Sequence, residues 1–139
     1  MKDSWFHPDR RGIYKGEVKD GIANGKGIYT SSHKGKKGNY KYYYKGAFVD
    51  GLKTGKGKQI INIPKWILKY QGSFKNNEKH GYGVATHIYK GKLYQKYFGE
   101  FKGGYMHGKG KLINYFEKIT KKGKFVKGGF KKWKIILNI

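Results

Sequence analysis

The fold follows from a pattern that occurs four times in 139 residues, as in the segment Tyr97-Phe98-Gly99-Glu100-Phe101-Lys102-Gly103-Gly104-Tyr105-Met106-His107-Gly108-Lys109-Gly110. Each copy opens with Tyr-x-Gly and closes with Gly-x-Gly, whose first glycine stands nine residues after the opening one. A motif repeated with one internal spacing predicts a single supersecondary unit that stacks against its neighbours. The repeat-defining glycines are Gly16, Gly25, Gly27, Gly46, Gly55, Gly57, Gly72, Gly81, Gly83, Gly99, Gly108 and Gly110.

Two further positions indicate that each copy is a β-hairpin. An apolar side chain stands two residues after the opening glycine: Val18, Phe48, Phe74, Phe101 and, in a fifth partial copy, Phe125. Turn-forming pairs follow at Asp20-Gly21, Asp50-Gly51, Asn76-Asn77 and Gly103-Gly104. Asp, Asn and Gly tolerate the positive φ that both central residues of a type I′ turn require. Hairpins are therefore predicted near 13–29, 43–59, 69–85 and 96–112, with a partial one at 121–130.

A two-residue loop with regular pairing also predicts a register. It places Gly16 opposite Gly25 and Tyr14 opposite Gly27. By the same register Tyr44 faces Gly57, Tyr70 faces Gly83, and Tyr97 faces Gly110. Because side chains alternate along a strand, the tyrosine, the opening glycine and the apolar residue share one face, and lysines occupy the other.

The pattern of Tyr-x-Gly, an aromatic residue, a turn and Gly-x-Gly resembles the MORN (membrane occupation and recognition nexus) repeat family over residues 13 to 130. A histidine before the closing glycines, as at His80 and His107, matches the same family. The resemblance implies an all-β fold: an elongated, single-layer antiparallel meander sheet of stacked hairpins. It also implies scaffolding for many members and membrane association with phosphoinositide affinity for some.

The segments between and beyond the hairpins leave alternatives open. The insertions, the longest from Thr30 to Tyr43, either lengthen the strands or form loops at one edge. Residues 1–12 are read as an N-terminal extension. Residues 131–139 are either a C-terminal cap or an uncovered sheet edge that binds another chain.

Composition restricts the function. The chain has 32 Lys plus Arg against 8 Asp plus Glu, which gives a formal net charge of +24. A surface this positive should attract polyanions, an anionic membrane or an acidic protein. An aromatic content of 17% argues for a folded chain, since disordered segments are poor in aromatics. No cysteine is present, which excludes disulfides and thiolate metal sites.

Two candidate binding surfaces follow from the alternation of faces. A protein-binding aromatic face would comprise Tyr14, Tyr44, Phe48, Tyr70, Phe74, Tyr97 and Phe101. Some of these side chains are expected to be core, and the sequence does not distinguish core from interface. An anion- or lipid-facing surface would comprise Lys15, Lys26, Lys45, Lys56 and Lys109. Rows of lysine at translated positions suit a plane of anionic headgroups.

Catalytic chemistry finds little support in the residues. Glu17 and Glu100 occupy equivalent repeat positions, too far apart for a catalytic carboxylate pair, and are expected to pair with neighbouring lysines. His80 and His107 are likewise repeat-equivalent, and scattered His and carboxylates do not make a zinc site. No enzymatic activity, cofactor or metal is therefore expected.

The sequence predicts a non-enzymatic scaffold or adaptor that binds a protein partner or neighbouring subunit through its aromatic face and an anionic surface through its lysines. The alternative is a peripheral membrane protein that binds anionic phospholipids. Non-specific nucleic-acid association through charge ranks third, because only two arginines are present. A homodimer is left open. An intracellular location, cytoplasmic or associated with membrane or cytoskeleton, is expected, because neither a signal peptide nor an apolar segment of about 20 residues occurs.

Overall fold

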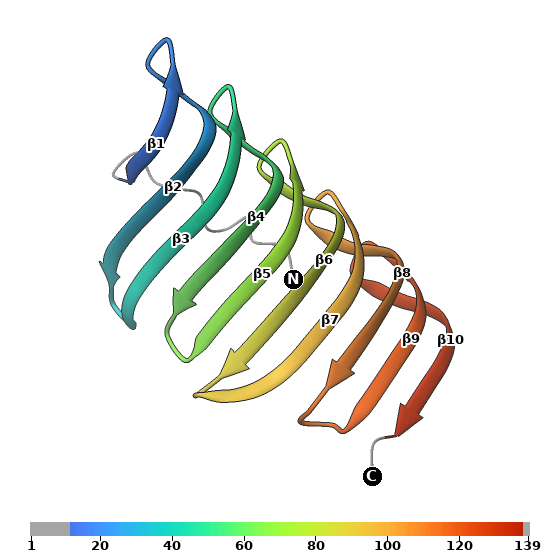
Figure 1. The fold of residues 1–139 in the computed structure, drawn as a ribbon. Helices are drawn as coiled ribbons and strands as arrows, with labels where there is room; N and C mark the ends of the chain where they lie inside the picture. The colour runs from blue at the N-terminus through green and yellow to red at the C-terminus, as the bar shows by residue number, and fades with distance from the viewer. Residues whose placement is uncertain (1–11, 138–139) are drawn as a thin grey trace.

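The computed structural model describes the backbone of residues 12–137 and the side chains of residues 12–131. All regular structure in this part of the chain is β, and ten strands form one antiparallel sheet in which each pairs with the next in sequence (Figure 1). The predicted all-β meander is confirmed. The strands are β1 (Ile13–Lys19), β2 (Ile22–Gly35), β3 (Gly38–Val49), β4 (Leu52–Ile63), β5 (Trp66–Lys75), β6 (Glu78–Tyr89), β7 (Lys92–Lys102), β8 (Tyr105–Asn114), β9 (Ile119–Val126) and β10 (Gly129–Leu137).

Five tight turns lie along one edge of the sheet, at residues 20–21, 50–51, 76–77, 103–104 and 127–128. Both residues of each turn have positive φ, as at Asp20 (52°) and Gly21 (77°), so the predicted type I′ geometry is confirmed at all four predicted pairs. The fifth pair, Lys127-Gly128, joins β9 to β10 and makes the partial copy a complete hairpin. This edge is called the short-arm edge below.

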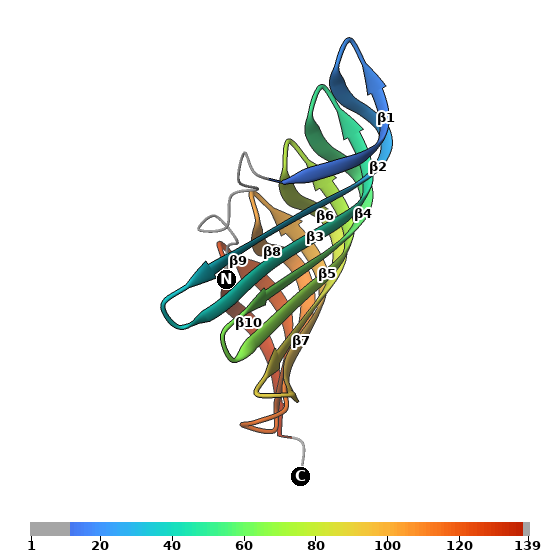
Figure 2. The same ribbon diagram turned by 90° about the vertical axis from the view of Figure 1, so that its left-hand side faces the viewer.

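A row of glycines crosses the sheet from β1 to β9. Backbone pairing aligns Gly16, Gly27, Gly46, Gly57, Gly72, Gly83, Gly99, Gly110 and Gly123 in one line. Figure 2 shows the strands bending sharply partway along, so that the sheet forms an open trough. A line of residues without Cβ permits such a bend and lets neighbouring side chains lie directly on the backbone. The row divides each strand into a short arm, ending at the short-arm edge, and a long arm, ending at the opposite, long-arm edge.

The register within each hairpin differs from the predicted one. Gly16 pairs with Gly27, not with Gly25, and Tyr14 pairs with Tyr29, not with Gly27. Equivalent shifts place Tyr44 opposite Gln59, Tyr70 opposite Ala85, and Tyr97 opposite Leu112. The second strand carries two extra residues in a β-bulge, where the first closing glycine adopts positive φ, as at Gly25 (97°). A shift of two residues preserves the faces, so the tyrosine, the opening glycine and the apolar residue do share one face.

The insertions lengthen the strands. The stretch from Thr30 to Tyr43 forms the long arms of β2 and β3 with the turn between them, and the other insertions form the long arms of later hairpins. The segment 131–139 continues β10 as far as Leu137, where it is an edge strand of the sheet. Residues 1–11 of the N-terminal extension lie outside the described residues.

Candidate functional site

A continuous ladder of aromatic rings fills the inner face of the trough. The Tyr44 ring packs edge-on against Phe48 of its own hairpin, with centroids 5.1 Å apart, and against Phe74 of the next hairpin at 5.2 Å. Tyr70 and Tyr97 make the same two contacts at 5.0 to 5.2 Å. Such edge-to-face pairs contribute about 0.5–1.5 kcal/mol each beyond area burial. These rings make up most of the hydrophobic core.

Each repeat tyrosine also ties its ring to the backbone. The Tyr44 hydroxyl donates to the carbonyl oxygen of Ala47 at 2.8 Å. The same bond, three residues on, joins Tyr14 to Glu17 (2.6 Å), Tyr70 to Ser73 (2.7 Å) and Tyr97 to Glu100 (2.8 Å). These carbonyls lie beside the bulge, where the regular ladder of backbone hydrogen bonds is interrupted. The hydroxyl therefore satisfies a backbone acceptor, which explains tyrosine rather than phenylalanine at this position.

Burial keeps these hydroxyls protonated. It raises the pKa of Tyr44 to about 12, and it also raises the pKa of Tyr70. At Tyr97 burial is again the main cause of the raised pKa, and the negative charge of Glu100 adds to it. Because tyrosine is charged only when it loses its proton, a low-dielectric site favours the neutral, donating form.

The residues predicted as a protein-binding platform form this ladder. Six of them are at most 5% exposed: Tyr44, Phe48, Tyr70, Phe74, Tyr97 and Phe101. Tyr14, on the first strand, is half-buried. The bend at the glycine row brings the rings of the short and long arms together, so that they cover one another. These six side chains are core, and a partner that approaches the chain meets other residues.

The outer face of the bend carries the predicted basic residues. Lys15, Lys26, Lys45 and Lys56 line a groove of about 370 Å³ together with glycines of the central row and the side chains at Ile28 and Ala47. All four lysines are exposed, as is Lys109 farther along the sheet. The groove places four ammonium groups around an apolar floor, which suits a group that combines negative charge with apolar surface.

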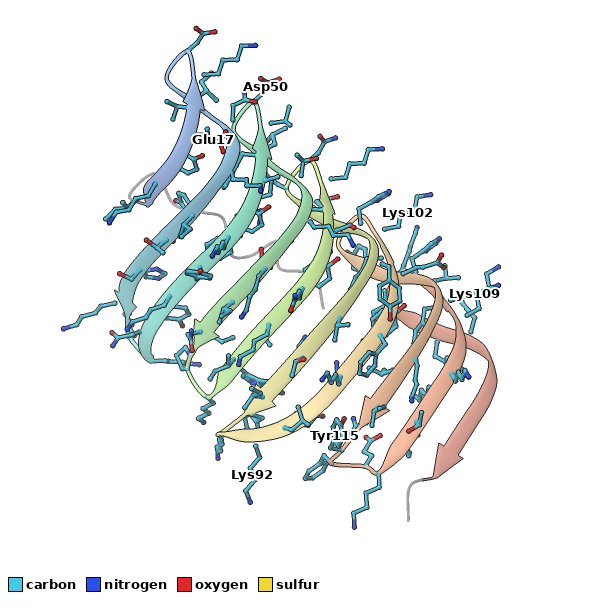
Figure 3. All side chains as sticks on the ribbon, in the orientation of Figure 1. Glu17, Asp50, Lys92, Lys102, Lys109 and Tyr115 are labelled. Carbon is cyan, nitrogen blue, oxygen red and sulfur yellow. The ribbon has the colours of Figure 1, made fainter. Side chains whose placement is uncertain are left out.

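Charge is divided unequally between the two sides of the glycine row. The short arms hold eleven of the described lysines and five of the six described carboxylates: Glu17, Asp20, Asp50, Glu78 and Glu100. The long arms hold only Glu117 together with sixteen lysines: Lys15, Lys34, Lys36, Lys37, Lys41, Lys45, Lys58, Lys65, Lys69, Lys90, Lys92, Lys96, Lys111, Lys118, Lys121 and Lys122. Figure 3 shows Asp50 near the short-arm edge and Lys92 at the opposite edge. The positive potential is therefore concentrated on the long arms.

Four rings from two consecutive hairpins and the turn that follows them form a second cluster at the long-arm edge, called the aromatic ledge below. Trp66 packs against Tyr89 and Tyr94 with centroids 4.6 and 5.2 Å apart, and Tyr94 stacks on Phe116 at 6.2 Å. Phe116, in the turn between β8 and β9, is 79% exposed. The ammonium of Lys90 lies 5.4 Å from the Tyr89 ring centroid. The repeat pattern did not predict this cluster, because its residues lie in segments treated only as insertions.

Two lysines lie on the inner face, which the sequence reasoning had not anticipated. The Lys53 ammonium donates to the Tyr42 hydroxyl at 2.5 Å and to Gln59 Oε1 at 2.8 Å, and the side chain is 7% exposed. Lys79, at the equivalent position of the next hairpin, is 6% exposed, with its ammonium 5.5 Å from the Tyr70 ring centroid. The repeat position could have indicated that these two lysines face inward, because the same position holds Ala23, Met106 and Phe130 in the other hairpins.

The repeat-equivalent carboxylates of Glu17 and Glu100 accept hydrogen bonds from the backbone at the bulge. Glu17 Oε1 accepts the backbone N–H of Lys26 at 3.3 Å, and Glu100 Oε2 accepts that of Lys109 at 2.7 Å. They were expected to pair with lysine side chains, but the hydrogen bonds run to the backbone that the bulge leaves without a ladder partner. Within residues 12–131 no group of three or more His, Asp or Glu is arranged to hold a metal ion. The described surface presents ammonium groups and exposed rings.

No helix long and apolar enough to cross a membrane occurs in the described part of the chain.

Comparison with known proteins agrees with the geometry. The MORN repeat pattern matches residues 14–32, 44–61, 70–87 and 97–114, which together make up more than half of the chain. The chain is also 34% identical, over 84 residues, to MORN repeat-containing protein 3 of Xenopus laevis. That alignment covers 58% of this chain and 32% of the relative, so the chain spans about a third of the relative's length. Proteins of this family are generally associated with scaffolding or membrane interaction and are generally non-enzymatic. With four matched repeats, the glycine row and the tyrosine ladder in one meander sheet, the chain belongs to the MORN repeat family.

Proposed function

We propose that this chain is a non-enzymatic scaffold whose lysine-rich outer face and long arms lie against an anionic surface of a larger assembly. The observation that carries the proposal is the division of charge at the glycine row. Among the described residues, the long arms carry sixteen lysines and one carboxylate, a net +15, whereas the short arms carry eleven lysines and five carboxylates, a net +6. A uniformly basic composition alone would not separate the charges in this way. The separation would orient the sheet with its long arms toward an anionic surface.

One row of lysines is well placed for such contact. Backbone pairing puts Lys15, Lys45, Lys58, Lys111 and Lys122 on the outer face, in the line of residues next to the glycine row. All five are exposed. Because the row follows the long axis of the sheet, its charges face a flat anionic surface together, each contributing on the order of 1 kcal/mol.

The test is a matched pair of charge reversals. We expect Lys45→Glu, Lys58→Glu and Lys111→Glu together to release the chain from vesicles of anionic composition at about 0.15 M salt, where the Debye length is about 8 Å. The control reverses three exposed lysines near the short-arm turns, Lys19, Lys75 and Lys102, with the same change of net charge. Equal loss of binding in both variants, or no loss in the first, would contradict the proposal.

An anionic lipid bilayer is the surface that the aromatic ledge favours. Phe116 is 79% exposed at a turn of the long-arm edge, beside Tyr115, which is 40% exposed, and Lys118. Rings and lysines side by side are typical of residues that sit at a membrane–water interface. A nucleic acid is less well supported, because the chain has only two arginines for base-specific contacts.

The substitution Phe116→Ser distinguishes binding to an anionic lipid bilayer from binding to a nucleic acid. A ring that enters the headgroup region contributes to vesicle binding, and its loss should weaken that binding several-fold while leaving binding to duplex DNA unchanged. Tyr82→Ser, at a ring that is 61% exposed in a closing Gly-x-Gly, is the control. Unaltered vesicle binding by the Phe116 variant would exclude the ledge from the contact.

A further inference from the structure

Two adjoining pockets on the outer face form one groove along β2, over the neighbouring strands β1 to β4 (Figure 1). The first is the lysine-lined groove at the bend, and the second has a volume of about 500 Å³. They are continuous, because Thr30 of the second stands two residues beyond Ile28 of the first on the same face of β2. The second pocket is lined by Ile13, Thr30, Ser31, Ser32, Lys41, Tyr42, Tyr43, Ile60 and Asn62. The combined feature is called the β2 groove below.

The β2 groove has a narrow floor between two walls. Ile28 and Thr30 of β2 form the floor. Lys15 on β1 and Lys45 on β3 pair with Ile28 from opposite sides, so the backbones of the two walls are two strand spacings apart, about 10 Å. An extended chain about 5 Å wide fits between them, whereas an α-helix of about 10–12 Å diameter does not. The groove therefore selects an extended segment.

Positive charge is concentrated at one end of the β2 groove. Among the described residues, five lysines and no carboxylate line it: Lys15, Lys26, Lys41, Lys45 and Lys56. Four of them surround the bend, and Lys41 stands at the other end. Glu17, which follows Lys15 on β1, accepts the backbone N–H of Lys26 at 3.3 Å. The bend end of the groove thus suits a negatively charged group.

The middle of the β2 groove combines apolar and hydrogen-bonding groups. Ile13 is 62% exposed, and Tyr43 and Ile60 are half-buried. The polar side chains here are those of Thr30, Ser32 and Asn62. An acyl chain would withdraw these hydroxyl and amide groups from water without offering a hydrogen bond. A nucleic acid carries a phosphate on every unit, whereas the middle of the groove is not basic. A peptide supplies both an apolar side chain and a hydrogen-bonding main chain.

The junction between the hairpins β1–β2 and β3–β4 differs from the next two junctions at the positions around the bend. Its six positions hold Lys15, Lys26, Lys45, Lys56, Ile28 and Ala47. At the second junction they hold Lys45, Lys56, Gln71, Tyr82, Lys58 and Ser73. At the third they hold Gln71, Tyr82, Phe98, Lys109, Val84 and Glu100. Four lysines around an apolar floor occur at one of these three junctions, so the repeat fold itself does not require them.

We propose that the β2 groove binds an extended, acidic segment of a partner protein. Side chains on one face of such a segment recur every two residues, about 6.8 Å, which is also the spacing of the outer-face positions along β2. Two acidic side chains at alternate positions meet Lys26 and then Lys15. The next alternate side chain, an apolar one, lies beside Ile13 and Tyr43, and a further acidic one reaches Lys41. The segment reads acidic-x-acidic-x-apolar-x-acidic over about 20 Å.

Fluorescence anisotropy of a labelled peptide, with the full chain at about 0.15 M salt, measures this contact. The probe is Glu-Ser-Glu-Ser-Leu-Ser-Asp, and the control, Glu-Glu-Ser-Leu-Asp-Ser-Ser, has the same composition in a different order. The net charge of +24 attracts both peptides equally. We expect the probe to bind on the order of tenfold more tightly, because it alone matches the groove. Equal affinity for the two peptides would overturn the proposal.

A pair of double variants locates the contact. Of the lysine row proposed above to face an anionic surface, the β2 groove includes only Lys15 and Lys45. Lys15→Gln with Lys45→Gln should weaken probe binding on the order of tenfold by removing two ion pairs. Lys111→Gln with Lys122→Gln makes the same change of charge in the same row outside the groove and should have less than about a third of that effect. Equal losses would mean that the probe follows net charge alone.

Thr30→Trp tests the groove without a change of charge. An indole on the floor occupies the space of the segment, so probe binding should fall on the order of tenfold. Thr86→Trp, at the equivalent outer-face position of β6, is the control and should bind the probe like the wild type. Strands accept aromatic residues, and urea unfolding checks both variants; the lysine variants keep the test decisive if either unfolds.

Two results with Thr30→Trp would overturn the proposal. One is unchanged binding of the probe. The other is an equal loss of binding to a single-stranded oligonucleotide or to anionic vesicles, which would assign the groove to those polyanions. Because the peptide measurement contains no vesicles, its failure would leave the proposed contact with an anionic surface unaffected.

Discussion

Replacing Tyr44 by phenylalanine tests whether the repeat tyrosine is retained for its hydroxyl. The ring is fully buried, and its edge-on contacts with Phe48 and Phe74 do not involve the oxygen. The substitution therefore preserves the ladder but removes the hydrogen bond to the Ala47 carbonyl at 2.8 Å. Leaving this part-buried acceptor without a donor costs about 1–3 kcal/mol, which is the loss of unfolding free energy expected at pH 7.

The same substitution should become less damaging at high pH. An unfolded tyrosine has a pKa of about 10, whereas burial raises that of folded Tyr44 to about 12. The folded state thus holds its proton more tightly, and the resulting stability is present below about pH 10 and is lost as the pH rises through about 12. At pH 11 the wild type has lost about 1.4 kcal/mol through this group. Phenylalanine has nothing to ionise, so the deficit of the variant should shrink by about that amount.

Urea unfolding at pH 7, 9, 10 and 11, followed by far-UV circular dichroism, measures the difference between the two chains. Comparison at each pH cancels the titration of lysine, which both chains share. Tyr82→Phe is the control: the ring is 61% exposed and should change the unfolding free energy by less than about 0.5 kcal/mol at pH 7. A Tyr44 deficit that is absent at pH 7, or that stays constant from pH 9 to 11, would refute the buried hydrogen bond.

Three further substitutions probe the bend, the bulge and the buried lysine. Gly83→Ala should lower the free energy of unfolding by about 1–3 kcal/mol, measured by thermal unfolding. A Cβ at this position would overlap the Tyr70 ring, which is held between its neighbours in the ladder. An unchanged free energy of unfolding would mean that the ring moves freely. Glu100→Ala should cost about 1 kcal/mol in urea unfolding by removing the acceptor for the Lys109 N–H at 2.7 Å, and Glu100→Gln should recover most of it. Lys53→Met should change the unfolding free energy by no more than about 1 kcal/mol. A buried cation is often replaceable by an apolar side chain, and methionine already fills this position in the fourth hairpin. A larger loss would show that the cation itself stabilises the core.

The register shows where prediction from local pattern failed. The spacing between Gly16 and Gly25 was compatible with regular pairing, and only the folded hairpin shows that two residues are accommodated in a bulge. A bulge changes which residues face each other without changing which face they occupy, provided that an even number is inserted. The face assignment of Tyr44 and Phe48 was therefore correct although the partner assigned to Tyr44 was not.

Repeat number, turn type and the division into two faces could be predicted from local sequence alone. These properties depend on residues close together in the chain: the spacing of Tyr-x-Gly and Gly-x-Gly, and turn pairs such as Asp20-Gly21 that accept positive φ. The resemblance to a known family rested on the same local pattern. The set of exposed lysines that includes Lys26 and Lys56 also followed from alternation alone.

Burial and the surfaces left for binding were decided only by the tertiary structure. Nine glycines come from nine strands, and the sheet bends along them only once register has aligned them. The bend then covers the tyrosine and phenylalanine rings, so a face that alternation marks as apolar becomes core instead of a docking platform. The ledge around Trp66 and Phe116 and the division of charge likewise gather residues from separate hairpins. Contacts between residues distant in the chain depend on register and curvature, which local spacing does not encode.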